Sequence, residues 1–362
     1  MTELERSRQI IDETDKQIAA LFEKRMDAAR AVAEYKRFNG LKIDDIAREE
    51  EIILRNSSYI ENEGYKPYYV NFLRETIKLS KAFQHRLLDG MRVAYSGVEG
   101  AFANIVAQRI FPDANCIPYA DFSAAYRSVE EGECDCVLLP IENSFNGDVG
   151  KVMDLSFFGS LYINGIYEAD IVQNLLGVKG AELKDIKKVI SHPQALGQCA
   201  PYIEKHGFET EEAVNTAVAA KLVAQMGRKD VAAIASEEAA EKFGLVKIES
   251  HINESNMNST RFAVFARTQK APSRNDGHFI MLFTVNNTAG SLGRAVSVIG
   301  EYGFNLKALK SRPTKELVWD YYFYAEGEGN INSPEGQNMI SALNECCSDV
   351  KILGSFEKEI KV

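Results

Sequence analysis

The first 90 residues repeat apolar side chains at intervals of three and four, the period of a helix that buries one face. The pattern predicts three helices, with expected bounds Leu4 to Phe38, Asp44 or Asp45 to Glu63, and Pro67 to Leu88. The first would be about 33 residues and about 50 Å long. Three helices of this kind cannot easily bury their apolar faces within one chain, so we expect this segment to form a dimer.

After Gly90 the pattern changes to short β-type runs that alternate with helical ones, which predicts an α/β segment with mainly parallel sheets. The expected strands are Arg92–Tyr95, Cys136–Pro140, Tyr162–Ala169, Lys188–Ser191, Val231–Ala235 and Arg261–Arg267. The expected helices are Ala101–Phe111, Phe122–Glu131, Pro193–His206 and Thr216–Met226. Two groups of such units predict two lobes with a ligand cleft between them.

A linker, Pro272 to Gly277, precedes a third segment with a β-α-β-β-α-β order. Its expected elements are His278–Asn286, Gly290–Tyr302, Asn305–Arg312, Leu317–Ala325, Pro334–Cys346 and Val350–Glu357. This order predicts a ferredoxin-like α+β domain, which is more often a regulatory or docking module than an enzyme. The expected domains are therefore residues 1–90, 91–270 and 277–362.

The composition is that of an ordinary globular protein, with 362 residues of which 45% are hydrophobic and 26% charged. The net charge of −10 argues against a nucleic-acid partner, which would need a basic surface. Residues 1–90 carry 16 Lys/Arg and 17 Asp/Glu, so nearly all the excess acid lies later in the chain. An anionic substrate there would have to be bound by specific arginines, because the overall field repels it.

The sequence offers no signal for a membrane or for export. No run of about 18 apolar residues occurs, and the first residues lack the apolar core of a signal peptide. The six cysteines include no Cys-x-x-Cys pair, which favours reduced thiols over disulfides or a metal site. We therefore expect a cytoplasmic protein.

Polar residues on the expected core faces of the helical segment are candidates for a binding site: Arg25, Lys36, Asp45, Arg48, Glu49, Ser80 and Gln84. Arg25 and Lys36 are 11 residues apart and return to nearly the same helical face. Arg8 lies 17 residues before Arg25, about 25 Å along the helix and about 100° around it. If Arg8 joins the same pocket, it must come from a second subunit. On spacing alone, a solvated charged helix is the somewhat better interpretation.

These eight polar positions together resemble the all-helical chorismate mutase family over the whole segment. The resemblance implies an intertwined homodimer that rearranges chorismate to prephenate without cofactor or metal. Catalysis would then come from holding a compact conformer of the dianion and stabilising charge on the breaking ether oxygen. The implied roles are carboxylate binding by Arg25 and the partner's Arg8 with Arg48 and Ser80, donation to the ether oxygen by Lys36 and Gln84, and binding of the ring hydroxyl by Glu49 and Asp45.

Four loops of the α/β segment stand at the ends of expected strands. They read Gly97-Val98-Glu99-Gly100-Ala101-Phe102, Pro140-Ile141-Glu142-Asn143-Ser144, Ser191-His192-Pro193-Gln194 with Gln198, and Asn258-Ser259-Thr260-Arg261-Phe262. The glycine pair before a helix can present backbone N–H groups to an anion. Each loop also has a purely structural interpretation, such as Ser191 capping the helix that follows it.

Together these loops resemble prephenate dehydratase over residues 91–270, a two-lobed α/β fold of the periplasmic-binding-protein type. The family converts prephenate to phenylpyruvate, and the resemblance implies that Thr260 hydrogen-bonds the leaving hydroxyl. Arg261 would bind a substrate carboxylate, with a structural salt bridge as the alternative. The other implied cleft residues are Glu142, Asn143, Ser144, Ser191, Gln194, Gln198 and Phe262, with Asn215 and Thr216 as lesser candidates. His192 is expected to orient its loop.

The C-terminal segment resembles the ACT regulatory domain that accompanies this dehydratase. The matching residues are Gly290-Ser291-Leu292, Ser311-Arg312-Pro313 and Trp319-Asp320-Tyr321. The resemblance implies that L-phenylalanine binds there as a feedback inhibitor, which requires different affinities for two conformations. A purely structural dimerisation role is the alternative for this domain.

Two other functions remain for the whole chain. One is a dehydratase alone, with the helical segment as a dimerisation arm, against which the complete polar set of that segment argues. The other is a two-lobed binding protein that senses an amino acid. The missing signal peptide and the Thr260-Arg261-Phe262 motif count against that function.

Overall fold

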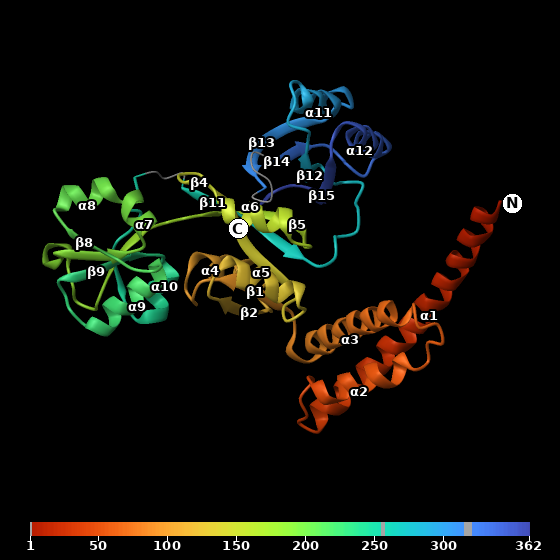
Figure 1. Ribbon diagram of the computed structural model, residues 1–362. Coiled ribbons are helices and arrows are strands. Elements are labelled where there is room, and N and C mark those ends of the chain that lie inside the picture. Colours follow the sequence, from red (N-terminus) through yellow and green to blue (C-terminus); the bar gives the residue numbers. More distant parts are fainter. Residues whose placement is uncertain (1, 255–257, 315–320) are drawn as a thin grey trace. The chain divides into compact units, whose positions relative to one another are not determined.

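The computed structural model describes residues 2–254, 258–314 and 321–362, and the chain forms two compact units (Figure 1). Unit 1 comprises residues 1–92 with the short segment 131–135, and unit 2 comprises the rest. None of the helices in the described ranges is long and apolar enough to cross a membrane. All six cysteines are free thiols.

Unit 1 contains the three expected helices, α1 (Glu3–Phe38), α2 (Ile46–Ser57) and α3 (Lys66–Asp89). Thr2 starts α1 with a capping box, and the Asp45 carboxylate starts α2 by accepting from the Arg48 N–H. The second helix ends at Ser57, earlier than the expected Glu63.

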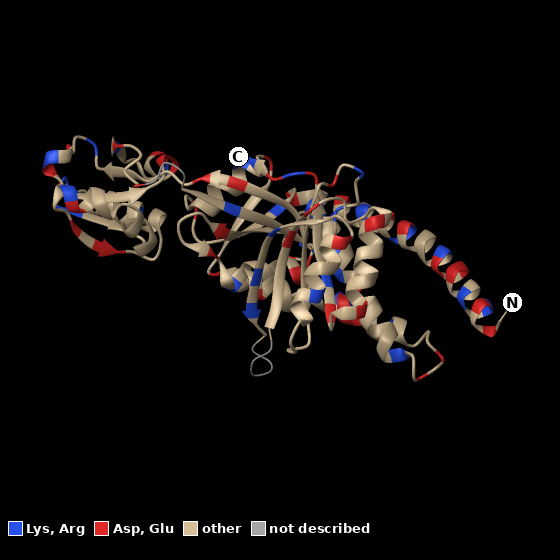
Figure 2. Ribbon diagram, turned by 90° about the horizontal axis from the view of Figure 1, so that it is seen from above, with Lys and Arg blue, Asp and Glu red and all other residues tan. Residues whose placement is uncertain are grey.

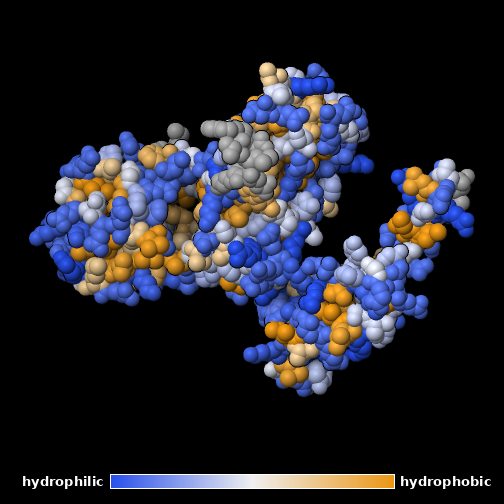
Figure 3. Space-filling model, viewed as in Figure 1, coloured by the Kyte–Doolittle hydropathy of each residue, from blue (hydrophilic) through white to orange (hydrophobic). Residues whose placement is uncertain are grey.

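The core of unit 1 is small, and much of its apolar surface is open. The buried apolar side chains are Ala29, Ala33, Ile53, Leu73 and Ile77. Charged residues of both signs follow the N-terminal part of α1 (Figure 2), yet its apolar side chains are also exposed (Figure 3). These exposed residues are Leu4, Ile10, Ile11, Ile18, Leu21 and Phe22. A surface of this kind marks an interaction site.

Unit 2 begins with a lobe built on a seven-stranded sheet of order β16-β5-β11-β3-β1-β2, with β4 beside β3. Its strands are β1 (Arg92–Ser96), β2 (Asn115–Tyr119), β3 (Cys136–Asn143), β4 (Gly147–Asp148), β5 (Tyr162–Asp170), β11 (Ser259–Ala266) and β16 (Ile360–Lys361). Its helices are α4 (Phe102–Ile110), α5 (Phe122–Glu130) and α6 (Gly150–Phe158). We call this the first lobe.

The second lobe is a five-stranded sheet of order β10-β6-β9-β7-β8 with four helices. Its strands are β6 (Asn174–Gly177), β7 (Lys188–Ser191), β8 (Glu209–Glu212), β9 (Val231–Ala235) and β10 (Val246–Glu249). Its helices are α7 (Pro193–Gln198), α8 (Ala200–His206), α9 (Thr216–Met226) and α10 (Glu237–Phe243), with a 3₁₀ turn at Leu183–Asp185. The chain enters this lobe after β5 and returns to the first lobe at β11.

The third sheet has four antiparallel strands in the order β13-β14-β12-β15, which with its two helices gives a ferredoxin-like topology. The elements are β12 (His278–Thr284), α11 (Ser291–Glu301), β13 (Asn305–Pro313), β14 (Tyr321–Glu328), α12 (Pro334–Cys346) and β15 (Asp349–Phe356). After β15 the chain returns to the first lobe, where β16 pairs with β5.

The structure corrects two expectations for the α/β segment. The sheets are mixed rather than mainly parallel, because β11 runs antiparallel to both β3 and β5, and β6 antiparallel to β9 and β10. The expected helix Pro193–His206 is two helices, since Pro201 starts a new helix at α8. Part of the expected strand from Leu317, with Trp319 and Asp320 of the C-terminal motif, lies outside the described residues.

Candidate active site

In unit 1, α1 and α3 bring three of the expected polar residues together. The Arg25 guanidinium donates to the Ser80 hydroxyl, and also to the Thr76 carbonyl at 3.2 Å. Gln84 follows Ser80 by one helical turn, and both side chains are buried. The Gln84 Oε1 atom has no hydrogen-bond partner among the described residues. A buried polar atom without a partner is unfavourable unless a ligand or water completes it.

Two more expected residues, Lys36 and Glu49, make a loop contact and an ion pair. The Lys36 ammonium donates to the Ile43 carbonyl at 2.7 Å, in the loop before α2. Glu49 is 2.9 Å from Lys81, which also lies 2.8 Å from Asp44. Burial opposes the charge on Lys81, but the hydrogen bonds that its ammonium donates to the Asp44 and Glu49 carboxylates outweigh burial and raise the pKa of Lys81. Lys81 directly follows Ser80, but the resemblance places Ser80 and Gln84 in the pocket and gives Lys81 no role.

The remaining three expected residues have local contacts or lie elsewhere on α1. Asp45 caps α2, and the exposed Arg48 side chain pairs with Glu51 at 2.7 Å. Arg8 lies on the exposed N-terminal part of α1, 17 residues from Arg25. The single chain therefore does not bring Arg8 to Arg25, as the helical geometry requires.

In unit 2 a cavity of about 490 Å³ lies between the two lobes, near the size range of small-molecule sites. It is lined by Thr260 and Phe262 from β11, Asn143 from β3, and Gln194 and Gln198 from α7. The lesser candidates Asn215 and Thr216, the loop residues Gly97, Ala101 and Phe102, and His192 also line it. Sequence reasoning missed Gln173, Ser96, Phe122 and Val214.

Thr260 and Asn143 lie opposite each other on paired strands and form the polar centre of this cavity. The Asn143 Nδ2 donates to the Thr260 Oγ1 at 2.9 Å, and the Asn143 Oδ1 accepts from the N–H groups of Phe145 and Asn146 at 3.0 Å. Both side chains are buried. Because Asn143 fills an acceptor position of Thr260, the hydroxyl proton of Thr260 is free to point at a bound ligand.

Arg261 does not line the cavity, because successive side chains of a strand point to opposite faces. Its guanidinium contacts three carboxylates, those of Glu142, Glu326 and Glu359, each at 2.7 Å. Burial opposes ionisation of Arg261, but the hydrogen bonds that its guanidinium donates to Glu326 and Glu142 outweigh burial and raise the pKa of Arg261. The structural salt bridge is therefore the alternative that fits, and Arg261 is not placed to bind a substrate carboxylate.

Three other expected cleft residues also have structural contacts instead. Glu142 faces Arg261 and Lys310, and their hydrogen bonds outweigh burial and lower the pKa of its carboxyl. The Ser191 hydroxyl donates to the Ile234 carbonyl at 2.6 Å, and the Ser144 hydroxyl accepts from the Ser259 N–H at 3.0 Å. None of the three lines the cavity. Each of them ties neighbouring strands together.

The described residues that line the cavity include no Lys, Arg, Asp or Glu. Positive potential comes instead from the N-terminal ends of α4 and α9, at Ala101–Ala103 and at Asn215–Thr216. Ala101 gives α4 no side-chain cap, so its first N–H groups are open to an anion. None of the described residues that line the cavity is an arginine, so the chain does not bring the expected arginines to this cavity.

His192 is the only titratable side chain among the described residues that line the cavity. Burial lowers the pKa of this imidazole, which favours its neutral form. Its Nδ1 accepts from the Gln194 N–H at 3.2 Å and caps α7, so the ring proton is on Nε2. This contact agrees with the expected loop-orienting role.

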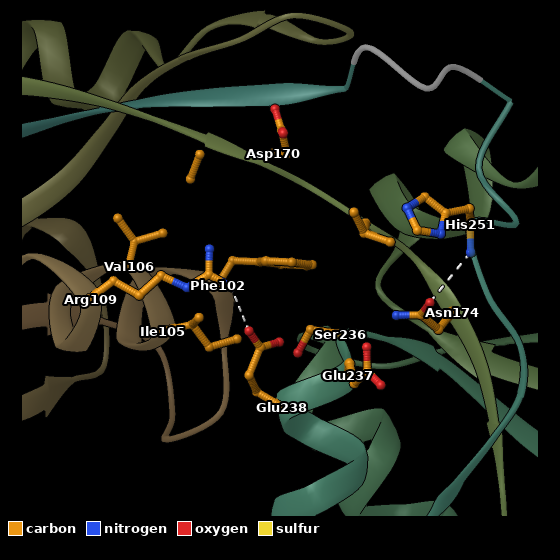
Figure 4. Close-up of a pocket in the computed structure, with 12 residues that line it drawn as sticks. Phe102, Ile105, Val106, Arg109, Asp170, Asn174, Ser236, Glu237, Glu238 and His251 are labelled. Carbon is orange, nitrogen blue, oxygen red and sulfur yellow. Dashed lines mark hydrogen bonds and ion pairs between the residues drawn. The ribbon is translucent and has the colours of Figure 1, made fainter. Parts of the chain in front are cut away.

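A smaller cavity of about 170 Å³ lies between α4 and α10 (Figure 4). Arg109 of the first lobe and Glu238 of the second are 2.6 Å apart there, and Phe102 lines both cavities. The Glu237 and Asp170 carboxylates are also paired, with Lys247 at 2.6 Å and with Lys361 at 2.9 Å. We interpret this small cavity as a gap in the packing between the two lobes.

The expected effector residues stand near one end of the third sheet. Gly290, in the left-handed conformation at φ +85°, begins α11, followed by Ser291 and Leu292. Ser311, Arg312 and Pro313 end β13, where the Arg312 guanidinium contacts Asp154 of α6 at 2.8 Å. Lys310, two residues before Arg312, contacts Glu142 at 3.0 Å and Asp148 at 2.5 Å. Lys310 and Arg312 therefore contact the first lobe, whereas Ser311 and Pro313, which alternate with them along β13, are exposed.

Comparison with known proteins gives matches for both units. The family model of chorismate mutase type II matches residues 7–85, and that of prephenate dehydratase matches residues 93–270. The bifunctional chorismate mutase/prephenate dehydratase of Aquifex aeolicus is 30% identical over 99% of each chain.

Two further relatives match the later part of the chain. Arogenate dehydratase/prephenate dehydratase 2 of Arabidopsis thaliana is 33% identical over 74% of this chain and 72% of its own. The solved prephenate dehydratase from Arthrobacter aurescens, in complex with L-Phe, has a TM-score of 0.69 and 24% identity over 74% of this chain and 90% of its own. This last likeness shows a shared fold.

Proposed function

Because the chain belongs to the family of bifunctional chorismate mutases/prephenate dehydratases, we propose which of its residues carry each of the two reactions. It rearranges chorismate to prephenate and converts prephenate to phenylpyruvate in phenylalanine biosynthesis. The observation that carries this function is the match over the full length to a bifunctional relative. The proposed domains are residues 1–90 for the mutase, 91–270 for the dehydratase and 277–362 for regulation.

The mutase reaction is an intramolecular rearrangement, so the protein has only to hold the reactive conformer and stabilise the charge that develops. Arg25, with Ser80, would bind one carboxylate of chorismate. Lys36 and the free amide of Gln84 would donate to the ether oxygen as its bond breaks. Glu49 would accept from the ring hydroxyl. The buried, unpartnered amide oxygen of Gln84 supports a ligand at this position, since rotation of the amide presents its NH₂ group instead.

The dehydratase reaction breaks the bond between the ring and its carboxylate, releasing CO₂. The electron pair enters the ring and expels the hydroxyl at the opposite carbon, which takes a proton and leaves as water. Thr260 would hydrogen-bond this hydroxyl, held in place by Asn143 at 2.9 Å. The N-terminal ends of α4 and α9 would bind the carboxylates, and Gln194 and Gln198 would line the cleft.

The exposed apolar side chains of α1 support a homodimer in which the partner's Arg8 completes the mutase site. Mixing two inactive variants tests this arrangement. In a mixed dimer, the Arg8→Ala chain still supplies Lys36 and the Lys36→Ala chain still supplies Arg8. One of the two sites would therefore have both residues and be intact, and the other would lack both. We expect random reassortment of subunits to restore about a quarter of wild-type mutase turnover.

The control for this mixing is each variant alone, carried through the same dissociation and reassociation. If Arg8 served the site of its own chain, every site in the mixture would lack one of the two residues. No recovery of turnover would then be seen, and a shared site would be excluded.

L-phenylalanine is the proposed effector, bound by the third sheet around Gly290–Leu292 and Ser311–Pro313. Support comes from the contacts of this sheet with the first lobe, which are made by Arg312, Lys310 and Glu326. We expect L-phenylalanine to bind in calorimetry and to inhibit the dehydratase, with a coupling of about 1–3 kcal/mol. D-phenylalanine is the control. An absence of heat at millimolar L-phenylalanine would favour a purely structural role for this domain.

A further inference from the structure

Gln173 lies on the segment that crosses from the first lobe to the second, between β5 and β6. Its backbone is fixed on both sides: its N–H donates to the Asn253 Oδ1 at 3.1 Å, and its carbonyl accepts from the Ile252 N–H at 2.9 Å. The neighbouring Ile171 N–H donates to the Asn258 carbonyl at 2.8 Å. Hydrogen bonds between the outgoing and returning segments therefore hold Gln173 in one place.

The Gln173 side chain lines the large cavity and is only 2% exposed. Its Nε2 donates to the Gln198 Oε1 at 3.3 Å, whereas its own Oε1 has no hydrogen-bond partner among the described residues. Buried side-chain amides in proteins are normally satisfied, so this oxygen lacks the donor that such an atom usually has. Neither the mechanism above nor the sequence motifs use it.

The two amides form a pair that can present either kind of atom to a ligand. A glutamine amide exchanges its acceptor and its donor when it rotates by 180°, with almost no change of shape. If both amides rotate, Gln198 donates to Gln173, and the Gln173 NH₂ group becomes the free one. The pair therefore offers an acceptor in one state and a donor in the other.

The substrate has one group that needs such a partner. Thr260 is placed at the ring hydroxyl, and the opposite ring carbon bears a three-carbon side chain with an α-keto group. The keto oxygen can only accept a hydrogen bond, whereas the ammonium of arogenate, the α-amino counterpart of prephenate, can only donate. No described residue that lines the cavity is a Lys, Arg, Asp or Glu that could distinguish the two by charge.

We propose that Gln173 binds the α-substituent of the substrate side chain and, with Gln198, sets the preference between the α-keto and the α-amino acid. The proposal rests on the assignment of this cavity as the dehydratase site. With prephenate the Gln173 NH₂ group donates to the keto oxygen, and with arogenate its Oε1 accepts from the ammonium. The rotation of one buried amide pair thus fits the pocket to either substrate class.

Gln173→Glu is the direct test when it is assayed at a pH high enough to ionise the buried carboxyl, because an ionised carboxylate accepts hydrogen bonds but cannot donate them. We expect kcat/KM for prephenate to fall, and the ratio of kcat/KM for arogenate to that for prephenate to rise by at least about tenfold. Gln173→Met has a similar volume and no polar atoms. We expect it to lower kcat/KM for both substrates without changing their ratio in favour of arogenate.

Gln108→Glu on the exposed side of α4 is the matched control, since it adds the same charge outside the cavity. Mutase turnover and the melting temperature show whether each variant folds. If Gln173→Glu lowers kcat/KM equally for prephenate and arogenate while mutase turnover is normal, Gln173 only supports Gln198 and the proposal is wrong. If Thr260→Ala keeps full dehydratase activity, the assignment of the cavity itself fails, which is a separate result.

Discussion

Thr260→Ala is expected to abolish conversion of prephenate to phenylpyruvate and to leave chorismate mutase turnover near normal. The hydroxyl of Thr260 is buried in the cavity wall and accepts from Asn143 at 2.9 Å, which leaves its proton free to donate to a ligand. Removing it leaves the departing hydroxyl without its donor, a loss of about 10²–10⁴-fold in kcat for a positioned proton-transfer group. Phenylpyruvate absorbance in alkali, with prephenate as substrate, measures this effect.

The matched control is Thr210→Ala on the exposed strand β8, which removes the same atoms from a residue outside the described cavity lining. Chorismate consumption by both variants reports the other site. Because sites without shared partners behave independently, mutase turnover should change little. Equal loss of both activities in Thr260→Ala would contradict two separate sites.

Lys36→Ala is expected to lower mutase kcat by about 10²–10³-fold, the size of effect seen when a donor to developing negative charge is removed. The fold should persist, because Lys36 makes one loop contact, to the Ile43 carbonyl at 2.7 Å, and is not part of the small apolar core. Loss of chorismate absorbance measures the rate, and circular dichroism measures the helix content.

Lys78→Ala on α3 is the control for charge, because its ammonium lies 4.0 Å from Glu75 in an accessible pair. Such pairs contribute little. Dehydratase activity with added prephenate should be normal in both lysine variants. Near-normal mutase turnover in Lys36→Ala would remove Lys36 from the proposed mechanism.

The helices, the order of the C-terminal domain and most strands could be predicted because they depend on local periodicity. Thr260 could be predicted from its motif, and its location in the cavity supports the proposed role. The direction of the Arg261 side chain could also have been predicted from the sequence. Two adjacent residues of one strand cannot both face the same cleft, so Thr260 in the cleft already places Arg261 on the other face.

Other features depend on contacts between distant segments and have no local signature. Gln173 stands outside any motif, and its burial arises only where the two crossover segments meet. No sequence pattern around Ile360 predicts that β16 returns to the first lobe and pairs with β5 at Tyr167. The net charge of the chain could not predict that the described cavity lining contains no arginine, because a sum over all residues says nothing about where each side chain points.

The cluster around Arg261 bears on whether the C-terminal domain is a detachable module. Two of the three carboxylates on this guanidinium, Glu326 and Glu359, come from beyond the linker. A chain truncated at the linker would keep a half-buried cation with a single counter-charge and would uncover the edge of β5, a site for aggregation. Engineering that aims to free the catalytic lobe from control should therefore rely on point substitutions rather than on deletion.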